Sequence, residues 1–182
     1  MATVILVPNA DVSNDWALSG LGDAQAHMST GHTGTIATDP LFLWDNATGQ
    51  VFEFDFPNPS IDFSSIDSVQ AVVSAGNNNR GQSFALEMTI NNASGGTFWA
   101  AEASGTQAAS LGYRTITFTS RTTSDGSNAW TITDLNNLRM KVELTALSGG
   151  LAKATYCQFI VTYTEPLATD NAIFFGCNFW DL

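Results

Sequence analysis

The amino-acid sequence predicts an all-β protein, an antiparallel jelly-roll-like β-sandwich with irregular N- and C-terminal arms. Charged residues make up only 13% of the 182 residues, about half the share of a typical globular domain. The polar surface must therefore come from Ser, Thr, Asn and Gly, which suit strands and turns better than helices. Several segments alternate apolar and polar side chains, and short polar turns separate them. No segment with helical periodicity is long enough to cover a sheet.

Three segments show this alternation most clearly: Val51–Phe56, Ser83–Ile90 and Leu138–Leu147. In the first of them, Phe52 and Phe54 fall on one face while the acidic residues between them fall on the other. Each segment is predicted to be a strand with one buried face and one solvated face.

Weaker strand patterns fill the intervals between these segments. In the strand expected near the C-terminal end of the core, Cys157 would face inward beside Phe159, so packing explains the cysteine without a redox role. A short helical turn is predicted over Thr133–Asn137, with its first or second residue as the N-cap. The weaker strands are Thr3–Val7, Ser68–Ala75, Thr97–Ala101, Arg114–Thr119, Thr155–Tyr163 and Ile173–Phe179.

The length fits a single domain spanning residues 1–182. Its core is expected at about residues 51–164. Residues 1–50 form an N-terminal arm with loops, in which Asn9–Leu41 lies outside the sandwich pattern, and residues 166–182 form an aromatic tail. Long irregular segments in a compact domain are usually functional loops or interaction arms.

The charge distribution argues against several partners. The formal net charge is −11, and no Lys or Arg precedes Arg80 or follows Lys153. Binding to a nucleic-acid backbone needs a basic patch, and anionic membrane surfaces attract the same positive charge. We therefore expect no nucleic-acid partner and no membrane partner.

The start of the chain predicts a protein made in a cytoplasm. Met1–Pro8 has no positively charged region and only a short apolar run, and no apolar run approaches the length of a membrane span. Cys157 and Cys177 are interpreted as two buried thiols rather than as a disulfide.

The order of the central motifs resembles jelly-roll structural proteins of tailed-phage virions. The resemblance covers roughly residues 52–164. It is carried by Ser65–Gln70, by Asn128–Leu138, which contains a Trp-Thr-x-x-Asp-Leu-x-x-Leu turn, by Met140–Leu144 and by Ile160–Tyr163. The pattern is one of strands and corners, in which Trp130 would close one end of the core.

This resemblance implies a virion structural protein, most simply a capsid decoration or cement protein that stabilises the shell through subunit contacts. Its partners would be the major capsid protein or tail and neck components. The chain would act as a homo-oligomer such as a trimer, located in the virion after assembly in the host cytoplasm. The resemblance brings no catalytic residues.

The alternative function is a receptor-binding tail or fibre component, or a carbohydrate-binding jelly-roll module. Sandwich folds bind sugars through exposed aromatic side chains, for which Trp99, Tyr113 and Trp44 are the candidates. A glycan-cleaving enzyme ranks last.

Residues with catalytic or metal-binding chemistry are few. His27 and His32 lack further ligands at zinc spacing, and Asp11–Asp15 resembles only the start of a calcium loop. Glu53 and Asp55 share one face of a strand, as paired acids of a glycosidase can, but exposed acids on a strand are far commoner. We expect no enzymatic activity, no metal and no cofactor.

Aromatic residues near both ends of the chain are the expected partner contacts, because aromatic side chains anchor many interfaces. The tail is either a last strand of the sandwich or a clasp on a neighbouring subunit. The candidate contact residues are Trp16, Trp44, Phe174, Phe175, Phe179 and Trp180.

Overall fold

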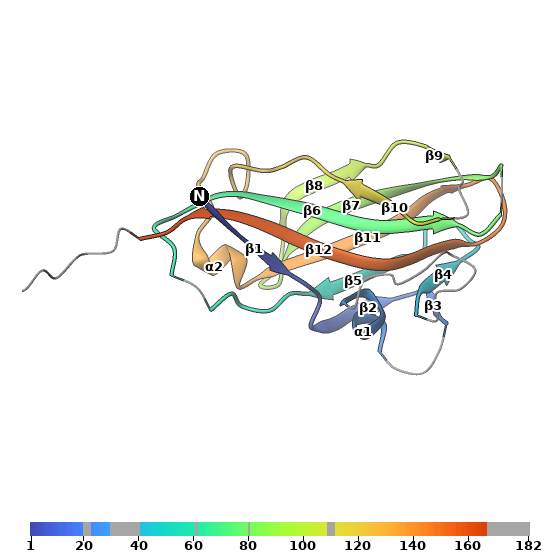
Figure 1. The fold of residues 1–182 in the computed structure, drawn as a ribbon, viewed down its shortest axis with the longest axis horizontal. Helices are drawn as coiled ribbons and strands as arrows, with labels where there is room; N and C mark the ends of the chain where they lie inside the picture. Colours follow the sequence, from blue (N-terminus) through green and yellow to red (C-terminus); the bar gives the residue numbers. More distant parts are fainter. Residues whose placement is uncertain (20–22, 30–40, 61, 80, 109–111, 167–182) are drawn as a thin grey trace, which may run out of the picture.

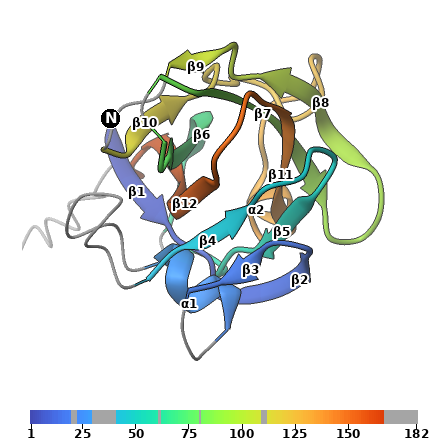
Figure 2. The same cartoon turned by 90° about the vertical axis from the view of Figure 1, so that its right-hand side faces the viewer.

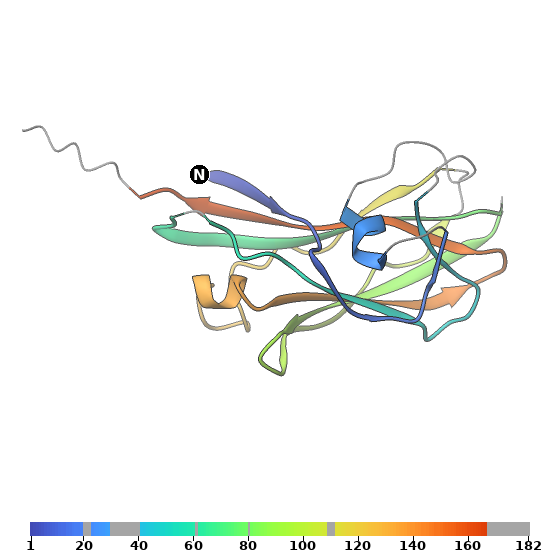
Figure 3. The same ribbon diagram turned by 90° about the horizontal axis from the view of Figure 1, so that it is seen from below.

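A computed structural model describes residues 1–19, 23–29, 41–60, 62–79, 81–108 and 112–166. Two antiparallel sheets, each of six strands, pack face to face. Figure 1 shows the strands running along the long axis of the molecule, and Figure 3 shows the two sheets as separate layers. The predicted all-β sandwich is confirmed.

The first sheet, sheet A, has the strand order β10-β6-β12-β4-β3, and β1 also pairs with β12. Neighbouring strands in this sheet are mostly distant along the chain, so the fold depends on long-range pairing. Its strands are β1 (Ala2–Leu6), β3 (Ala17–Leu18), β4 (Leu43–Asp45), β6 (Ser65–Asn77), β10 (Arg114–Thr117) and β12 (Ala152–Thr164).

The second sheet, sheet B, has the order β2-β5-β11-β7-β8, and β9 also pairs with β7. The chain crosses between the sheets repeatedly, as in a jelly roll. Its strands are β2 (Ala10–Asn14), β5 (Val51–Asp55), β7 (Ser83–Asn92), β8 (Thr97–Ala103), β9 (Gln107–Ala108) and β11 (Leu138–Leu147).

The longest ladder joins β6 to β12. It runs from the pair Ser65 and Thr164 at one end to Asn77 and Ala152 at the other, with two register shifts between. A tight turn carries β11 into β12, where Gly150 has a φ of +76° and a Cβ would lie 2.6 Å from the Asn77 side chain. Glycine is needed at this turn for both reasons.

The core lies between the sheets and is rich in aromatic rings. Phe52 and Phe54 of β5 are fully buried, and Phe56 meets Phe159 of β12 edge-on across the two layers, with the ring centroids 4.6 Å apart. Cys157 lies on the same face of β12, as its alternation predicts, and burial raises the pKa of its thiol well above the usual value. A neutral buried thiol serves packing.

Helix α1 (Ala24–Ser29) closes one long edge of the sandwich. Viewed along the molecule in Figure 2, it lies beside β2, β3 and β4, where the two sheets would otherwise part. Ala24 and Met28 bury their side chains in the core there. The Asp11 carboxylate accepts a hydrogen bond from the Ala24 N–H at 3.0 Å, which fixes the start of the helix.

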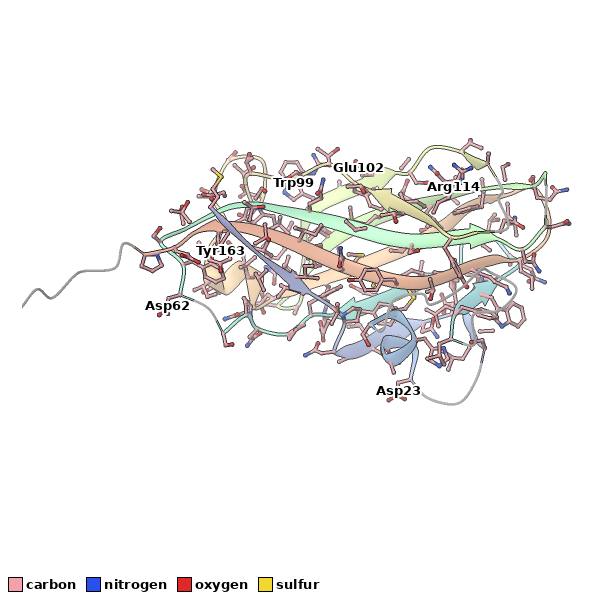
Figure 4. The ribbon with its side chains drawn as sticks, viewed as in Figure 1. Asp23, Asp62, Trp99, Glu102, Arg114 and Tyr163 are labelled. Carbon is pink, nitrogen blue, oxygen red and sulfur yellow. The ribbon has the colours of Figure 1, made fainter. Side chains whose placement is uncertain are left out.

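A polar network closes the opposite long edge, between β8 and the segment after β10. The Glu102 carboxylate accepts hydrogen bonds from the N–H and hydroxyl of Thr119 and pairs with Arg121 at 2.6 Å. The Arg121 guanidinium also stacks on Trp99, 4.3 Å from the ring centroid. Figure 4 shows Trp99 and Glu102 on this edge. Because each charge is paired, the seam can lie partly out of water.

The predicted strands agree with the structure wherever residues are described, and the one predicted at Ile173–Phe179 lies outside them. The stretch Asn9–Leu41, expected to be irregular, is corrected in part. It supplies β2, β3 and α1, because its apolar residues are needed at the sandwich edge. The short helix α2 (Ile132–Leu135) forms with Thr131 as its N-cap, two residues before Thr133, the first of the two residues expected to cap it.

Within the described residues, no helix is long and apolar enough to cross a membrane.

Replacing Phe159 by Ala should destabilise the domain strongly, because the ring is fully buried against Phe56. We expect the free energy of unfolding in urea to fall by about 3 to 5 kcal/mol. The matched control is Ile5→Ala, at a side chain that is 56% exposed, which should change it by less than about 0.5 kcal/mol. Equal losses at the two positions would contradict the assigned core.

Candidate functional site

A cavity of about 340 Å³ opens at the end of the sandwich where β6 begins. Two segments far apart in the sequence form it: the turn that leads into β6, and the start of α2. Figure 4 shows Asp62 and Tyr163 at this end of the molecule. The lining residues are Asp62, Phe63, Ser64, Ser65, Ile66, Trp130, Thr131 and Ile132.

The first wall is fixed to the end of β12. The Ser64 N–H and hydroxyl both donate to the Thr164 carbonyl, at 2.9 and 3.0 Å. Phe63 packs edge-on against Tyr163, with the ring centroids 4.9 Å apart. These contacts hold the half-buried Phe63 side chain beside the cavity.

The second wall is fixed by the capping box of α2. The Thr131 hydroxyl accepts a hydrogen bond from the Asp134 N–H at 3.2 Å, and the Asp134 carboxylate accepts from the Thr131 N–H at 2.8 Å. Trp130 lies beneath, 4% exposed, and its indole N–H donates to the Arg121 carbonyl. Ile132 projects outward and is 43% exposed.

The cavity combines apolar walls with a few polar groups. Phe63 and Ile132 supply apolar surface, and Ser64, Ser65 and Thr131 supply hydroxyls. Apolar surface with a small number of placed polar groups is typical of sites for small molecules. Asp62, which is exposed, is the one carboxylate among the lining residues, and these residues include no His, Cys, Lys or Arg.

The histidines do not form a metal site in the part of the chain that is described. His27 is buried, with its ring Nδ1 3.5 Å from the Phe42 carbonyl, and His32 lies outside the described residues. Among those residues, no three His, Cys, Asp or Glu side chains come together as metal ligands.

The calcium-like segment Asp11–Asp15 has a structural role instead. The Asp11 carboxylate accepts from the N–H of Ala24, and the Asp15 carboxylate accepts from the N–H of Val51 at 3.3 Å. Both acids join the N-terminal segment to its neighbours.

The paired acids of β5 are also used in cross-strand contacts. Glu53 accepts a hydrogen bond from the Asn91 side chain at 2.9 Å. Asp55 binds Arg139 at 2.5 Å, and this hydrogen bond raises the pKa of the guanidinium. Both acids lie on the outer face of sheet B and neither lines the cavity.

The expected partner-contact residues are placed only in part. Trp16 is corrected: it is 2% exposed, packs edge-on against Phe52 and donates its indole N–H to the Gln50 carbonyl. Its ring therefore belongs to the core of this chain. Trp44 is half-buried in β4, and its role stays a prediction. The remaining four, which are Phe174, Phe175, Phe179 and Trp180, lie outside the described residues.

The aromatic residues considered as sugar platforms are not among the residues that line the cavity. Trp99 is half-buried, Arg121 stacks on its ring, and its indole N–H donates to the Thr123 carbonyl at 2.8 Å. Tyr113 and Trp44 are half-buried as well.

Asp62, Phe63 and Ile132 were not identified from the sequence. Their two segments are more than sixty residues apart, and only the fold brings them together. The available signal was the Trp-Thr-x-x-Asp motif around Trp130, which predicts a closed end of the sandwich and so points to one of the two walls.

No protein-family model matches this chain, and no curated protein matches it. Among solved structures, it is similar to a truncated AlyQ with CBM32 and alginate lyase domains, with a TM-score of 0.51 and 12% identity. That match covers 91% of this chain and 34% of the other, so this chain spans about a third of that structure's length.

Two further structures match at lower TM-scores. The C-terminal CBM6 of LamC, a marine laminarinase from Zobellia galactanivorans, matches with a TM-score of 0.42, 10% identity and coverage of 88% of this chain and 99% of that one. A xylan-binding module, CBM15, matches with a TM-score of 0.38, 15% identity and coverage of 90% and 99%.

At these identities the comparisons show the fold alone. Fold and cavity together define an all-β sandwich domain with a small-molecule-sized cavity at one end. Modules named for carbohydrate binding are among its structural neighbours.

Removing the Thr131 hydroxyl should weaken the wall that carries Ile132. We expect Thr131→Ala to lower the free energy of unfolding by about 1 kcal/mol, because the helix loses its N-cap acceptor, and Thr131→Ser to restore it. Thr133→Ala is the control, because Thr133 is in the same helix and is also exposed, but its hydroxyl does not cap the helix. If chemical denaturation gives the same loss for Thr131→Ala and Thr133→Ala, the capping role is wrong.

Proposed function

We propose that this domain is a non-catalytic binding module that holds a saccharide in the cavity at the end of the sandwich. The observation that carries the proposal is the lining itself, in which apolar walls from Phe63 and Ile132 stand beside three hydroxyls and the Asp62 carboxylate.

A sugar ring matches this lining because its faces carry C–H groups and its rim carries hydroxyls. Phe63 and Ile132 can contact a ring face and remove apolar surface from water. The Asp62 carboxylate can accept hydrogen bonds from sugar hydroxyls, and hydrogen bonds to a charged acceptor are the stronger kind. The polar groups then select orientation, while the walls supply contact area.

The lining also favours binding over hydrolysis. Glycoside hydrolysis generally uses two carboxyl groups on either side of the scissile bond. The cavity lining holds one, Asp62, and the pair considered from the sequence, Glu53 and Asp55, is engaged with Asn91 and Arg139.

The solved structures of similar fold are compatible with this proposal. The structure that matches with a TM-score of 0.51, truncated AlyQ, is described as containing CBM32 and alginate lyase domains. Together with the resemblance to jelly-roll proteins of phage virions, a saccharide site would suit a receptor-binding tail or fibre component.

Trimming the aromatic wall should weaken saccharide binding. A glycan array identifies the ligand, and calorimetry then compares the intact protein with Phe63→Ala. We expect about a tenfold loss of affinity, because one aromatic contact contributes about 1 kcal/mol or more.

Ile5→Ala is the control, since it truncates an apolar side chain that lies outside the cavity lining. Thermal melting of Phe63→Ala checks that the domain stays folded. A folded variant with unchanged affinity would place the saccharide elsewhere, and an array without any bound glycan would reject the proposal.

A second candidate function is the virion decoration protein that the sequence favoured. The observation behind it is strand β1, which among the described strands pairs only with β12 and carries the exposed side chain of Ile5. Edge strands with exposed apolar residues are suited to pairing with another chain. The partners would be a second copy of this chain and the major capsid protein or tail and neck components.

Light scattering measures the mass of the purified protein, alone and with undecorated capsids. A decoration protein should form a discrete oligomer such as a trimer and saturate the particles. Ile5→Asp, which places a charge on the β1 edge, should shift that oligomer toward monomer. A stable monomer that ignores capsids would overturn this second candidate and leave the saccharide site standing.

A further inference from the structure

We propose that the end cavity takes a neutral saccharide, one terminal residue at a time, and discriminates against uronic acids and other anions. This inference rests on the proposed saccharide-binding function and adds the chemical class of the ligand.

Size limits the ligand to the end of a glycan. A cavity of about 340 Å³ is at the lower limit of ligand sites, which span about 300 to 1,000 Å³. Its walls come from the turn before β6 and the start of α2, at one end of the sandwich rather than along the face of either sheet. A long internal stretch of polymer needs an extended groove, whereas a single terminal residue fits a small cavity between two turns.

Charge restricts the ligand further. Asp62 lines the cavity directly. Two more carboxylates are bonded to lining residues: Asp67 accepts from the Ser65 hydroxyl at 3.0 Å, and Asp134 accepts from the Thr131 hydroxyl at 2.8 Å. Glu165, which is exposed, contacts the cavity wall through its backbone, because its carbonyl accepts from the Ser64 hydroxyl at 3.3 Å. Three carboxylates, those of Asp62, Asp67 and Asp134, therefore lie at the cavity or are bonded to its lining.

No described Lys or Arg side chain lines the cavity to balance this charge. Arg121 pairs with Glu102, and Arg139 pairs with Asp55. Arg114 lies toward the opposite end of the molecule from Asp62, as Figure 4 shows. Recognition of a carboxylate usually uses Arg in a bidentate contact, and the described lining offers none.

A uronic acid would thus bring its carboxylate next to Asp62 with no positive side chain in contact. Like charges at close range oppose binding. A neutral sugar of the same shape has the same ring hydroxyls and lacks the repulsion from Asp62. This preference would separate the domain from a binder of acidic polymers, the substrate class named for the lyase domain of its structural neighbour.

The test uses matched ligands that differ only at one carbon. Calorimetry compares oligosaccharides ending in glucose or galactose with the same chains ending in glucuronate or galacturonate, at low and at high salt. We expect the neutral ligand to bind at least about tenfold more tightly at low salt, and the ratio to shrink at high salt, because ions screen charge repulsion but not shape.

Asp62→Asn keeps an acceptor and removes the charge. This variant should reduce the affinity ratio between the neutral and the uronate-ended ligand by at least about fivefold, a shift of about 1 kcal/mol. The affinity for the neutral ligand should change little. Glu143→Gln makes the same charge change on β11, outside the cavity lining, and should leave the ratio unaltered.

Each result is decisive. Uronate-ended ligands that bind as tightly as neutral ones, or a preference that neither salt nor Asp62→Asn alters, would overturn the charge selection while saccharide binding stands. Failure of every saccharide, neutral and acidic, to bind would overturn the proposed function and this inference with it.

Discussion

The antiparallel ladder between β6 and β12 is the constraint on which the rest of the structure depends. It joins residues that are 75 to 99 positions apart in the chain and pairs them along both strands, with two register shifts. At one end it places Asn77 against the β11–β12 turn, and at the other it places Ser65 against Thr164. Because the period of a strand is two, a slip of one residue would turn Phe159 and Cys157 out of the core. The aromatic contacts between the sheets and the wall of the end cavity both follow from this register.

A two-layer sandwich also has to keep water out along its sides, and this chain does so in two different ways. Apolar side chains of α1 close one side, held by the Asp11 carboxylate. The charged pair of Glu102 and Arg121 closes the other, stacked on Trp99. A lone buried charge would be costly there, but a paired and hydrogen-bonded one is tolerated. In a chain with so few basic residues, the use of Arg121 and Arg139 in such pairs leaves little positive charge for binding.

Local patterns explain why so much of the fold is predictable. Strand 138–147 is predicted with its observed bounds, because alternation identifies its length and its buried face as far as Leu144. Ala146, which alternation also assigned to the core, is exposed, because a register shift after Leu144 reverses the pattern. The N-terminal segment is different: β2 and α1 are short and their residues have weak propensities, so tertiary packing decides their structure. Tertiary packing also decides the role of Trp16, since an aromatic residue near a terminus has the same sequence signature whether it packs inside or binds a partner. The cavity was beyond reach because its two walls lie far apart in the sequence and only the fold brings them together.

The position of the cavity follows from how a sandwich ends. Along the strands, backbone groups are paired and inner faces are filled, so little space remains for a ligand. Where strands stop, the chain must turn, and the core is covered by whatever the turns provide. Here Trp130 seals the core while Phe63 and Ile132 stand above it, held by hydrogen bonds to β12 and within α2 rather than by packing on all sides. Walls that are fixed at their base and open at their rim are preorganised without being filled, so a ligand can add contacts at little cost in ordering. A ligand bound at this end would therefore need no change in either sheet.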